Sequence, residues 1–218
     1  MSTIIPPHYP TRAERIADLV VHVAALSLAL FGAGIALGLA VSHGVTGRIA
    51  AVGVYALGLI AMLAFSTAYN FAHPRLQPML YRVDHVGIFL MIAASYTPFT
   101  TQLLHGAWSW GMTITVWALA IVGILVRLFL PRLGEMASIV FYLALGWVVL
   151  IAIKPLIHDT PLPALILLAA GGIVYTVGAV LFMKPLKFRR AIWHGHVLAG
   201  AASHYAAIMI GVVMATAK

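Results

Sequence analysis

Ionisable and polar side chains occur inside the hydrophobic stretches of this chain, and most of them lie toward the same end of their stretch. If successive stretches alternate in direction across a bilayer, these side chains share one leaflet. A charged group in hydrocarbon costs roughly 2.5–3.5 kcal/mol on insertion scales, so such residues usually face a bundle interior and serve a function. The set comprises Glu14, Asp18, His22, Ser66, Asn70, Asp84, His85, Arg190 and His194.

The first stretch carries Glu14, Asp18 and His22 at positions i, i+4 and i+8. This spacing places all three on one stripe of a helix, about two turns long. A stripe of two acids and an imidazole can hold a proton, a metal ion or an arginine from a neighbouring helix. The alternative is that Glu14 and Asp18 only stabilise the helix N-terminus through its dipole.

The second and third stretches carry further polar residues at the same end. Ser66 and Asn70 stand at i and i+4, where Ser and Asn commonly serve only as interhelical hydrogen-bonding groups. Asp84 opens the third stretch and is either a site residue or an N-terminal cap and dipole partner. Its neighbour His85 points elsewhere around the helix.

In the last stretch Arg190 and His194 share a face at i and i+4, whereas His196 lies about 200° from His194 at 100° per residue. His196 is therefore expected to face lipid or to be structural. His204 lies about 15 Å deeper than His194 at 1.5 Å per residue and lines the same cavity only if that cavity is deep. The other histidines are expected in tails or loops as ordinary surface residues: His8, His43, His73, His105 and His158.

Composition fixes the class of protein. Of the 218 residues, 63% are hydrophobic and 8% are charged, and the mean hydropathy is +1.04. So little charge cannot cover the surface of a soluble domain, so we expect an integral membrane protein that contacts membrane lipids. A nucleic-acid partner is excluded because no soluble basic face exists. The absence of cysteine excludes disulfides, thiolate zinc sites and cysteine nucleophiles.

Seven apolar runs are long enough to cross a bilayer, which needs about 20 residues. They cover residues 16–41, 49–72, 85–104, 108–130, 134–157, 162–183 and 194–217. The linkers are short, so we expect one seven-helix bundle over residues 1–218, with residues 1–15 as a cytoplasmic tail. The first run carries Asp18 and His22, which is not typical of a cleavable signal peptide.

The basic residues predict the orientation, because cytoplasmic loops are enriched in Lys and Arg. One side of the expected bundle holds Arg12, Arg15, Arg75, Arg82, Arg127, Arg132, Lys184, Lys187, Arg189 and Arg190. The other side holds Arg48, Lys154 and Lys218. The N-terminus is therefore expected in the cytoplasm and the C-terminus outside.

Segment 82–99, with Arg82-Val83-Asp84-His85 at its start, resembles the helix-three signature of the hemolysin III family. This family is the bacterial branch of the adiponectin and progestin receptor-like (PAQR) superfamily. Further similarities are Glu14-x3-Asp18-x3-His22, Ser66-Thr67-Ala68-Tyr69, Gly171-Gly172-x2-Tyr175-Thr176-x-Gly178, and Trp193-His194 with His204. The resemblance implies a seven-helix bundle with a cytoplasmic N-terminus, expected in a bacterial inner membrane.

The resemblance also implies a zinc ion held by three imidazoles, from a Ser-x3-His motif on helix two and a His-x3-His motif on helix seven, with an aspartate holding a metal-bound water. This chain has Asn70 and Arg190 at two of these positions and keeps only His194. An amide is a poor zinc ligand and a guanidinium cannot bind a cation. Arg190 is instead expected to form an internal ion pair, with Asp84, Asp18 or Glu14 as partner.

A rearranged metal centre stays open as an alternative, with nitrogen and oxygen ligands drawn from His22, Asp84, His85, His194 and His204.

Three functions are compatible with these alternatives for the polar residues. The first is the sensing or adjustment of membrane lipid state, with a lipid headgroup in the polar site. The second is a metal-dependent, ceramidase-like lipid amidase in which Asp84 and Ser66 are catalytic. The third is a pore or cytolytic protein.

Overall fold

The computed structural model describes residues 8–129 and 135–215, and within these ranges the secondary structure is entirely helical. The long helices are α1 (Arg12–Ser42), α2 (Thr46–Phe71), α3 (Gln77–Gln102), α4 (Gly106–Phe129), α7 (Leu162–Phe182) and α8 (Arg189–Ile208). Shorter elements are α5 (Glu135–Gly146), the 3₁₀ segment η1 (Trp147–Ala152), α6 (Ile153–Asp159) and the π-helical segment η2 (Met209–Val213).

Six helical segments are long and apolar enough to cross a membrane. They are Arg12–Ser42, Thr46–Phe71, Gly106–Phe129, Met136–Asp159, Leu162–Phe182 and Arg189–Val213. The seventh expected span corresponds to α3, which is 26 residues long and runs the length of the bundle beside the others. Polar residues such as Arg82 and Asp84 make α3 less apolar than its neighbours, as expected for a helix enclosed by other helices.

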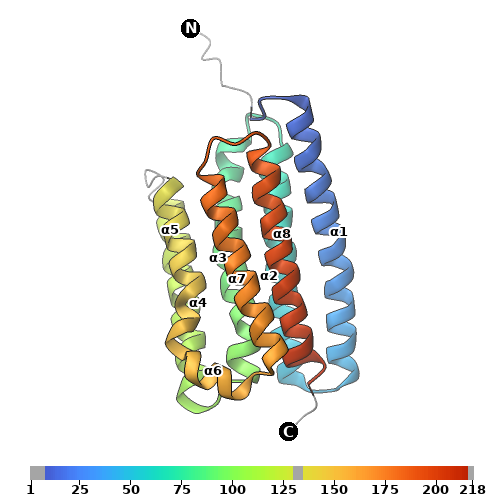
Figure 1. The fold of residues 1–218 in the computed structure, drawn as a ribbon, viewed down its shortest axis with the longest axis vertical. Helices are drawn as coiled ribbons and strands as arrows, with labels where there is room; N and C mark the ends of the chain where they lie inside the picture. The colour runs from blue at the N-terminus through green and yellow to red at the C-terminus, as the bar shows by residue number, and fades with distance from the viewer. Residues whose placement is uncertain (1–7, 130–134, 216–218) are drawn as a thin grey trace.

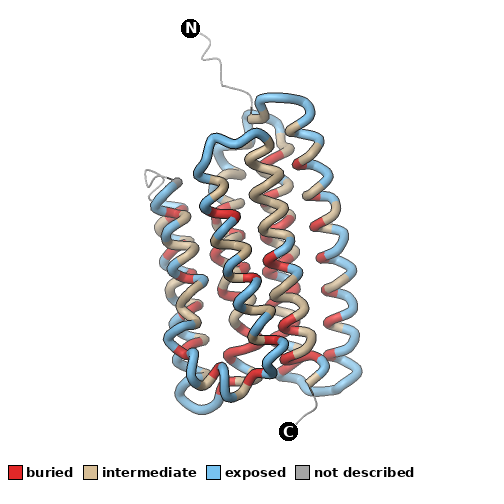
Figure 2. The backbone as a smooth tube through the Cα atoms, in the orientation of Figure 1, coloured by how far each residue is buried: buried red, intermediate tan, exposed pale blue. Residues whose placement is uncertain are grey.

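The helices run side by side along one axis, and the two ends of the described chain lie at opposite ends of the bundle (Figure 1). We call the end where α1 begins the N-terminal end. The closest packing is between α2 and α3 and between α7 and α8. Figure 2 shows that the buried positions form stripes facing the interior, whereas the outer faces of the helices are exposed, as a membrane protein requires.

The inward stripe of α1 explains how this helix positions polar groups. Its buried residues recur every three or four positions: Asp18, His22, Ala25, Ala29, Ala33, Ala36 and Ala40. Thr11 caps the helix, because its Oγ1 accepts a hydrogen bond from the backbone N–H of Glu14 at 3.2 Å. Asp18 and His22 therefore face the bundle interior from the same side as the alanines that let α1 pack closely.

Glycines set the close approach of α2 and α3. A Cβ added at Gly58 would lie 2.4 Å from the Cβ of Ala94, and one added at Gly87 would lie 3.1 Å from the Cα of Met62. Small residues at such contacts allow helix backbones to approach in a membrane, where packing replaces the hydrophobic effect. This contact fixes the polar ends of α2 and α3 relative to each other.

The predicted run 134–157 is not one continuous helix. α5 ends at Gly146, η1 follows, and α6 begins at Ile153. Tyr96 of α3 compensates for the break, because its hydroxyl donates toward the carbonyl oxygens of Gly146 at 2.6 Å and Leu145 at 3.2 Å and accepts from the backbone N–H of Val149 at 2.9 Å. Neighbouring side chains commonly satisfy a helix interrupted inside a membrane in this way.

Several helices begin before the residue that the sequence predicts, and the differences are largest for α3 and α8. α3 starts at Gln77 rather than residue 85, and α8 starts at Arg189 rather than residue 194. Phe188, which precedes α8, adopts a left-handed conformation with φ of 59°. The early starts place Asp84 in the second or third turn of α3 and Arg190 at the second residue of α8, so both belong to helices rather than loops.

Candidate functional site

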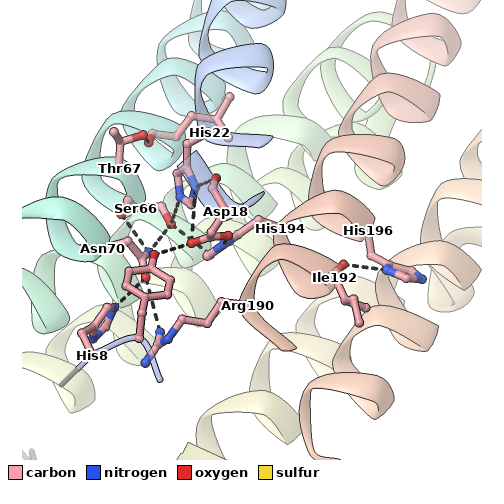
Figure 3. Close-up of polar contacts among 12 residues, drawn as sticks. His8, Asp18, His22, Ser66, Thr67, Asn70, Arg190, Ile192, His194 and His196 are labelled. Carbon is pink, nitrogen blue, oxygen red and sulfur yellow. Dashed lines mark hydrogen bonds and ion pairs between the residues drawn. The ribbon is translucent and has the colours of Figure 1, made fainter. Parts of the chain in front are cut away.

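Polar side chains from α1, α2 and α8 meet at the N-terminal end of the bundle (Figure 3). Asp18 and His22 come from α1, Ser66 and Asn70 from α2, and His194 from α8. Asp18 is 0% exposed and His22 is 3% exposed. We call these five residues the polar cluster. The structure thus brings together the residues that the helical spacing placed on inward faces.

The carboxylate of Asp18 is the centre of the polar cluster. Its Oδ1 accepts a hydrogen bond from Nδ1 of His194 at 2.6 Å, and its Oδ2 accepts one from the hydroxyl of Tyr9. Its backbone oxygen accepts from Nδ1 of His22 at 2.9 Å. Because oxygen acceptors take both Nδ1 atoms, each imidazole carries its proton on Nδ1 and leaves Nε2 with a free lone pair.

Both free imidazole nitrogens face one hydroxyl. Ser66 Oγ lies 3.4 Å from Nε2 of His22 and 3.4 Å from Nε2 of His194. The carboxylate of Asp84, whose side chain is 13% exposed, lies beside the same hydroxyl. A serine hydroxyl has one proton to donate, so these acceptors compete for it. The arrangement leaves lone pairs that a proton, a cation or a reacting group can use.

Asn70 and Arg190, the two departures from the family's zinc ligands, contact each other. The Asn70 side-chain oxygen accepts hydrogen bonds from the Arg190 guanidinium at 3.3 Å and from His8 Nε2 at 2.9 Å. The amide nitrogen donates to the Ser66 backbone oxygen at 2.9 Å. Zinc bound by three imidazoles in the family's usual form therefore does not fit, because two of its positions hold an amide and a cation that bond to each other.

The expected ion pair of Arg190 with a carboxylate is not formed among the described residues. Asp18 and Asp84 pair there only with histidines, namely His22, His194 and His85. Glu14 instead accepts a hydrogen bond from the backbone N–H of Phe188 at 3.4 Å, beside the start of α8. Both oxygens of the Asp18 carboxylate already accept hydrogen bonds from His194 and Tyr9, and the guanidinium donates to Asn70 instead.

Two residues of the polar site lie outside the hydrophobic stretches and were missed from the sequence. His8, expected as an ordinary surface residue, binds Asn70 and packs edge-on against Tyr69. Burial is the main cause that lowers the pKa of His8, and the nearby Arg190 also lowers it. Burial and the bond to Asp18 raise the pKa of the Tyr9 phenol. Only proximity to the Glu14–Asp18–His22 stripe could have pointed to these residues.

The other candidate residues occupy separate places. Nδ1 of His85 donates a hydrogen bond to the Tyr81 backbone oxygen at 2.8 Å. His204 contacts the Leu168 oxygen at 3.3 Å and lies deep in the bundle. His196 donates to the Ile192 oxygen and packs against Gly178, in agreement with a structural role. The remaining histidines are exposed, as expected: His43, His73, His105 and His158. Of these, His158 lies in α6 rather than in a loop.

A cavity of about 200 Å³ extends from the polar cluster into the bundle. Asp84, Asn70, Arg190 and the cluster imidazoles line its N-terminal end. Its walls further in are mostly apolar and aromatic: Ile88, Met91, Ile92, Leu143, Trp147, Tyr175 and Val197. His204 also lines it, so the cavity is deep enough to contain both His194 and His204. One polar end and a long apolar body make the cavity amphipathic.

Within the described residues, Asp18, His22 and His194 form a group that could hold a metal ion. Their potential ligand atoms all lie within 4.8 Å of one another. This group shares His22 and His194 with the metal centre considered from the sequence and adds Asp18, whereas Asp84, His85 and His204 are not part of it. An ion held here would take one ring nitrogen from each histidine and a carboxylate oxygen from Asp18.

Comparison with known proteins agrees with the geometry. The family model described as Haemolysin-III related matches residues 13–205. The chain is 35% identical to Hemolysin-3 of Bacillus cereus over 202 residues, which cover 92% of each chain. It is 29% identical to the Hemolysin-3 homolog of Bacillus subtilis (strain 168) over 201 residues, covering 91% of this chain and 94% of that protein.

The likeness extends beyond bacteria. The human monocyte to macrophage differentiation factor is 28% identical over 163 residues, covering 71% of this chain and 67% of that protein. This match supports the relation to the PAQR superfamily. The matched segment of the family model includes every residue of the polar cluster as well as Asp84 and Arg190. The chain is an integral membrane protein that belongs to the haemolysin III-related family.

Proposed function

We propose that the protein binds a membrane lipid in the cavity and thereby senses or adjusts membrane lipid state. The observation that carries this proposal is the amphipathic shape of the cavity, with the polar cluster at one end and an apolar body. A lipid headgroup can form hydrogen bonds at the polar end while an acyl chain lies against the aliphatic and aromatic walls. Ligand sites typically combine a mostly apolar lining with a few convergent polar groups.

Lipid binding is tested by blocking the cavity. Leu143 of α5 lines it, whereas Val140 on the same helix is 59% exposed on the outside. The purified wild type should retain a specific lipid class through extensive detergent exchange, detected by native mass spectrometry. Leu143→Trp should lose this lipid, and the matched control Val140→Trp should keep it. Equal retention by both variants would contradict the cavity as the binding place.

The proposal also covers how the helices of the protein are arranged in the membrane. We infer seven spans, with α3 as the enclosed one, a cytoplasmic N-terminus, and a bacterial inner membrane as the location. The uneven distribution of Lys and Arg supports this orientation, because most of them lie at the N-terminal end of the bundle, whereas Arg48 and Lys154 lie toward the other. The polar cluster would then lie in the cytoplasmic half of the bilayer.

A second candidate is a metal-dependent lipid amidase, favoured by the group Asp18, His22 and His194. Zinc at this group would supply a Lewis acid and a water of lowered pKa for hydrolysis. Protein purified without chelator or polyhistidine tag should then hold about one zinc per chain. His194→Ala should lose the metal, whereas His196→Ala, on the same helix but outside the group, should keep it. Metal-free wild type would exclude this candidate.

A further inference from the structure

Three residues of the polar cluster form a directed chain of hydrogen bonds. Asp18 Oδ1 accepts from Nδ1 of His194 at 2.6 Å, and Nε2 of His194 lies 3.4 Å from the hydroxyl oxygen of Ser66. Since Nδ1 carries the imidazole proton, Nε2 is the basic atom and it faces the serine. Carboxylate, imidazole and hydroxyl thus stand in the order that activates a serine nucleophile, in which the imidazole is held in the correct tautomer by the acid.

We propose that Ser66 is a nucleophile activated by His194 and oriented through Asp18, so that the polar cluster acts as a metal-free acyl hydrolase site for a carboxylic ester or amide bearing an acyl chain. This activity goes beyond lipid binding, and only the choice of acyl chain rests on the proposed function. The distance of 3.4 Å is within the range that apo sites show before substrate tightens the bond.

Asn70 and Arg190, which disfavour the family's zinc site, favour nucleophilic attack by Ser66. Hydrogen bonds from Arg190 and His8 occupy the Asn70 side-chain oxygen, so the amide nitrogen points toward Ser66. That nitrogen lies 3.4 Å from Ser66 Oγ. An N–H donor there can stabilise the oxyanion, which forms on the acyl carbon attached to Oγ, a role that amides and charged donors fill in other acyl-transfer sites. Asn70 and the Arg190 cation would thereby replace the positive charge of a metal.

The proposed reaction balances with water as the only co-reactant. Ser66 Oγ bonds to the acyl carbon, and its proton passes to Nε2 of His194. The acyl C–O or C–N bond breaks, and the leaving group takes that proton. Water then attacks the acyl carbon and gives a proton to the same nitrogen. The Oγ–acyl bond breaks, Ser66 Oγ takes that proton back from Nε2, and the carboxylic acid leaves. The cavity beyond the cluster offers an apolar wall for the acyl chain.

Two further groups face Ser66 and allow other assignments. His22 Nε2 is also 3.4 Å from the hydroxyl, but its Nδ1 bonds to a neutral backbone oxygen rather than a carboxylate. Asp84 lies beside the hydroxyl without an imidazole between them. Of the two imidazoles, His194 is the one whose Nδ1 donates a hydrogen bond to the Asp18 carboxylate, so we assign it as the base, and the variants below separate the three groups.

A fluorophosphonate probe tests the proposal without knowledge of the substrate, because it forms an Oγ–P bond and releases fluoride only at an activated serine. In detergent-solubilised full-length protein, we expect labelling that peptide mass spectrometry assigns to Ser66. Ser66→Ala should abolish it, while Ser203→Ala, whose hydroxyl donates to the Leu167 oxygen, should not. Absence of labelling in the wild type, or labelling at another serine, would overturn the proposal.

The rate of labelling distinguishes the roles of the residues around Ser66. His194→Asn should slow labelling by at least about 100-fold, the usual contribution of a general base. Asp18→Asn, a change at a positioning residue, should lower the maximal labelling rate and leave the half-saturating probe concentration unchanged. If Asp84→Asn or His22→Asn stops labelling while His194→Asn does not, the proposed triad is wrong.

A second variant keeps the test valid if Ser66→Ala does not fold. The chain has no cysteine, so Ser66→Cys places a single thiol at the site. This thiol should react with iodoacetamide at least about 100-fold faster with His194 present than in the Ser66→Cys, His194→Asn double variant. Equal rates in the two proteins would show that His194 does not activate position 66 and would refute the proposal.

Discussion

Asn70 and Arg190 show how two single residues change the chemistry available to a bundle of helices. Each occupies a position where the family resemblance implies an imidazole, and their side chains bond to each other at 3.3 Å. The guanidinium supplies a fixed positive charge near Asp84 and the polar cluster. The positive charge of Arg190 thus takes the place of a metal ion in balancing the negative charge of the buried acids.

Restoring both imidazoles should therefore restore zinc binding. In the double variant Asn70→His, Arg190→His, two new imidazoles join His194, which completes the three-nitrogen set that zinc prefers. We expect about one zinc per chain that persists after treatment with EDTA, measured by plasma mass spectrometry. The Arg190→His single variant serves as the control. If the wild type retains as much zinc through the same treatment, the two substitutions do not disfavour the metal.

His8 gives the N-terminal segment a predictable pH response. Its pKa is lowered from the ordinary value of 6.5, mainly by burial. The conformation in which His8 bonds to Asn70 therefore prefers the neutral imidazole. This contact is stable above pH 6.5 and weakens as the pH falls below that value. Hydrogen exchange of the segment around residues 8–11, corrected for intrinsic rates, should show less protection at about pH 5.5 than at about pH 7.5.

The control for this response is His8→Gln, which keeps a hydrogen-bond donor for Asn70 but does not titrate. Its protection should be the same at both pH values. If the wild type and His8→Gln lose protection equally on acidification, another group causes the change and the assignment to His8 fails.

The residues of the polar cluster could be predicted where they follow helical periodicity. Asp18 and His22, and likewise Ser66 and Asn70, stand four residues apart on inward faces, and α8 brings His194 to them. Tyr9 and His8 could not be found in this way, because they precede α1 and have no periodicity. Which group accepts the Arg190 guanidinium depends on side-chain geometry, which spacing along the chain does not contain.

At the scale of helices, the break after Gly146 depends on one side chain of α3. The Tyr96 hydroxyl contacts two carbonyl oxygens and one backbone N–H at the break. Tyr96→Phe leaves these groups without this partner, at about 1–3 kcal/mol for each unsatisfied group. We expect a clearly lower midpoint of thermal unfolding in detergent. Tyr55→Phe is the matched control, because within the described residues its buried hydroxyl has no hydrogen-bond partner.

Near-equal melting temperatures of Tyr96→Phe and Tyr55→Phe would show that the hydroxyl of Tyr96 does not stabilise the break. The break itself was not predicted, although Gly146 stands at the end of α5 and Pro155 lies further along the run 134–157. Apolar composition predicts that the segment crosses the membrane, whereas a partner on α3 determines its shape.

The contact of α2 with α3 depends on Gly58. A methyl group at this position would lie 2.4 Å from the Ala94 Cβ and 3.6 Å from the Leu90 backbone oxygen, so the helices must separate. Gly58→Ala should destabilise the protein by about 1–3 kcal/mol, as overpacking usually does. Gly53→Ala on the same helix meets nothing closer than 3.9 Å and should be tolerated. Thermal unfolding of both variants distinguishes a specific contact from a general effect of alanine.

At the scale of the whole molecule, composition and hydropathy predicted the class of protein and the sequence of helices along the chain. They could do so because a bilayer requires each span to be both long enough and apolar. The number of spans is harder to predict from apolarity alone. α3 is enclosed by its neighbours and carries Arg82, Asp84 and His85, so it is less apolar than the six other candidate spans. These polar residues explain why hydropathy alone does not place α3 among the candidate spans.

Whether α3 crosses the membrane can be decided with single cysteines, since the chain has none of its own. Arg75 precedes α3 and His105 follows it, and both are exposed. If α3 spans and the N-terminus is cytoplasmic, a membrane-impermeant maleimide should label His105→Cys in intact spheroplasts and should reach Arg75→Cys only after permeabilisation. Labelling of both from outside would mean that α3 does not cross, whereas the reverse pattern would keep seven spans and invert the orientation. Inversion would move the polar cluster to the outer half of the bilayer, so that any lipid it binds would come from the opposite leaflet.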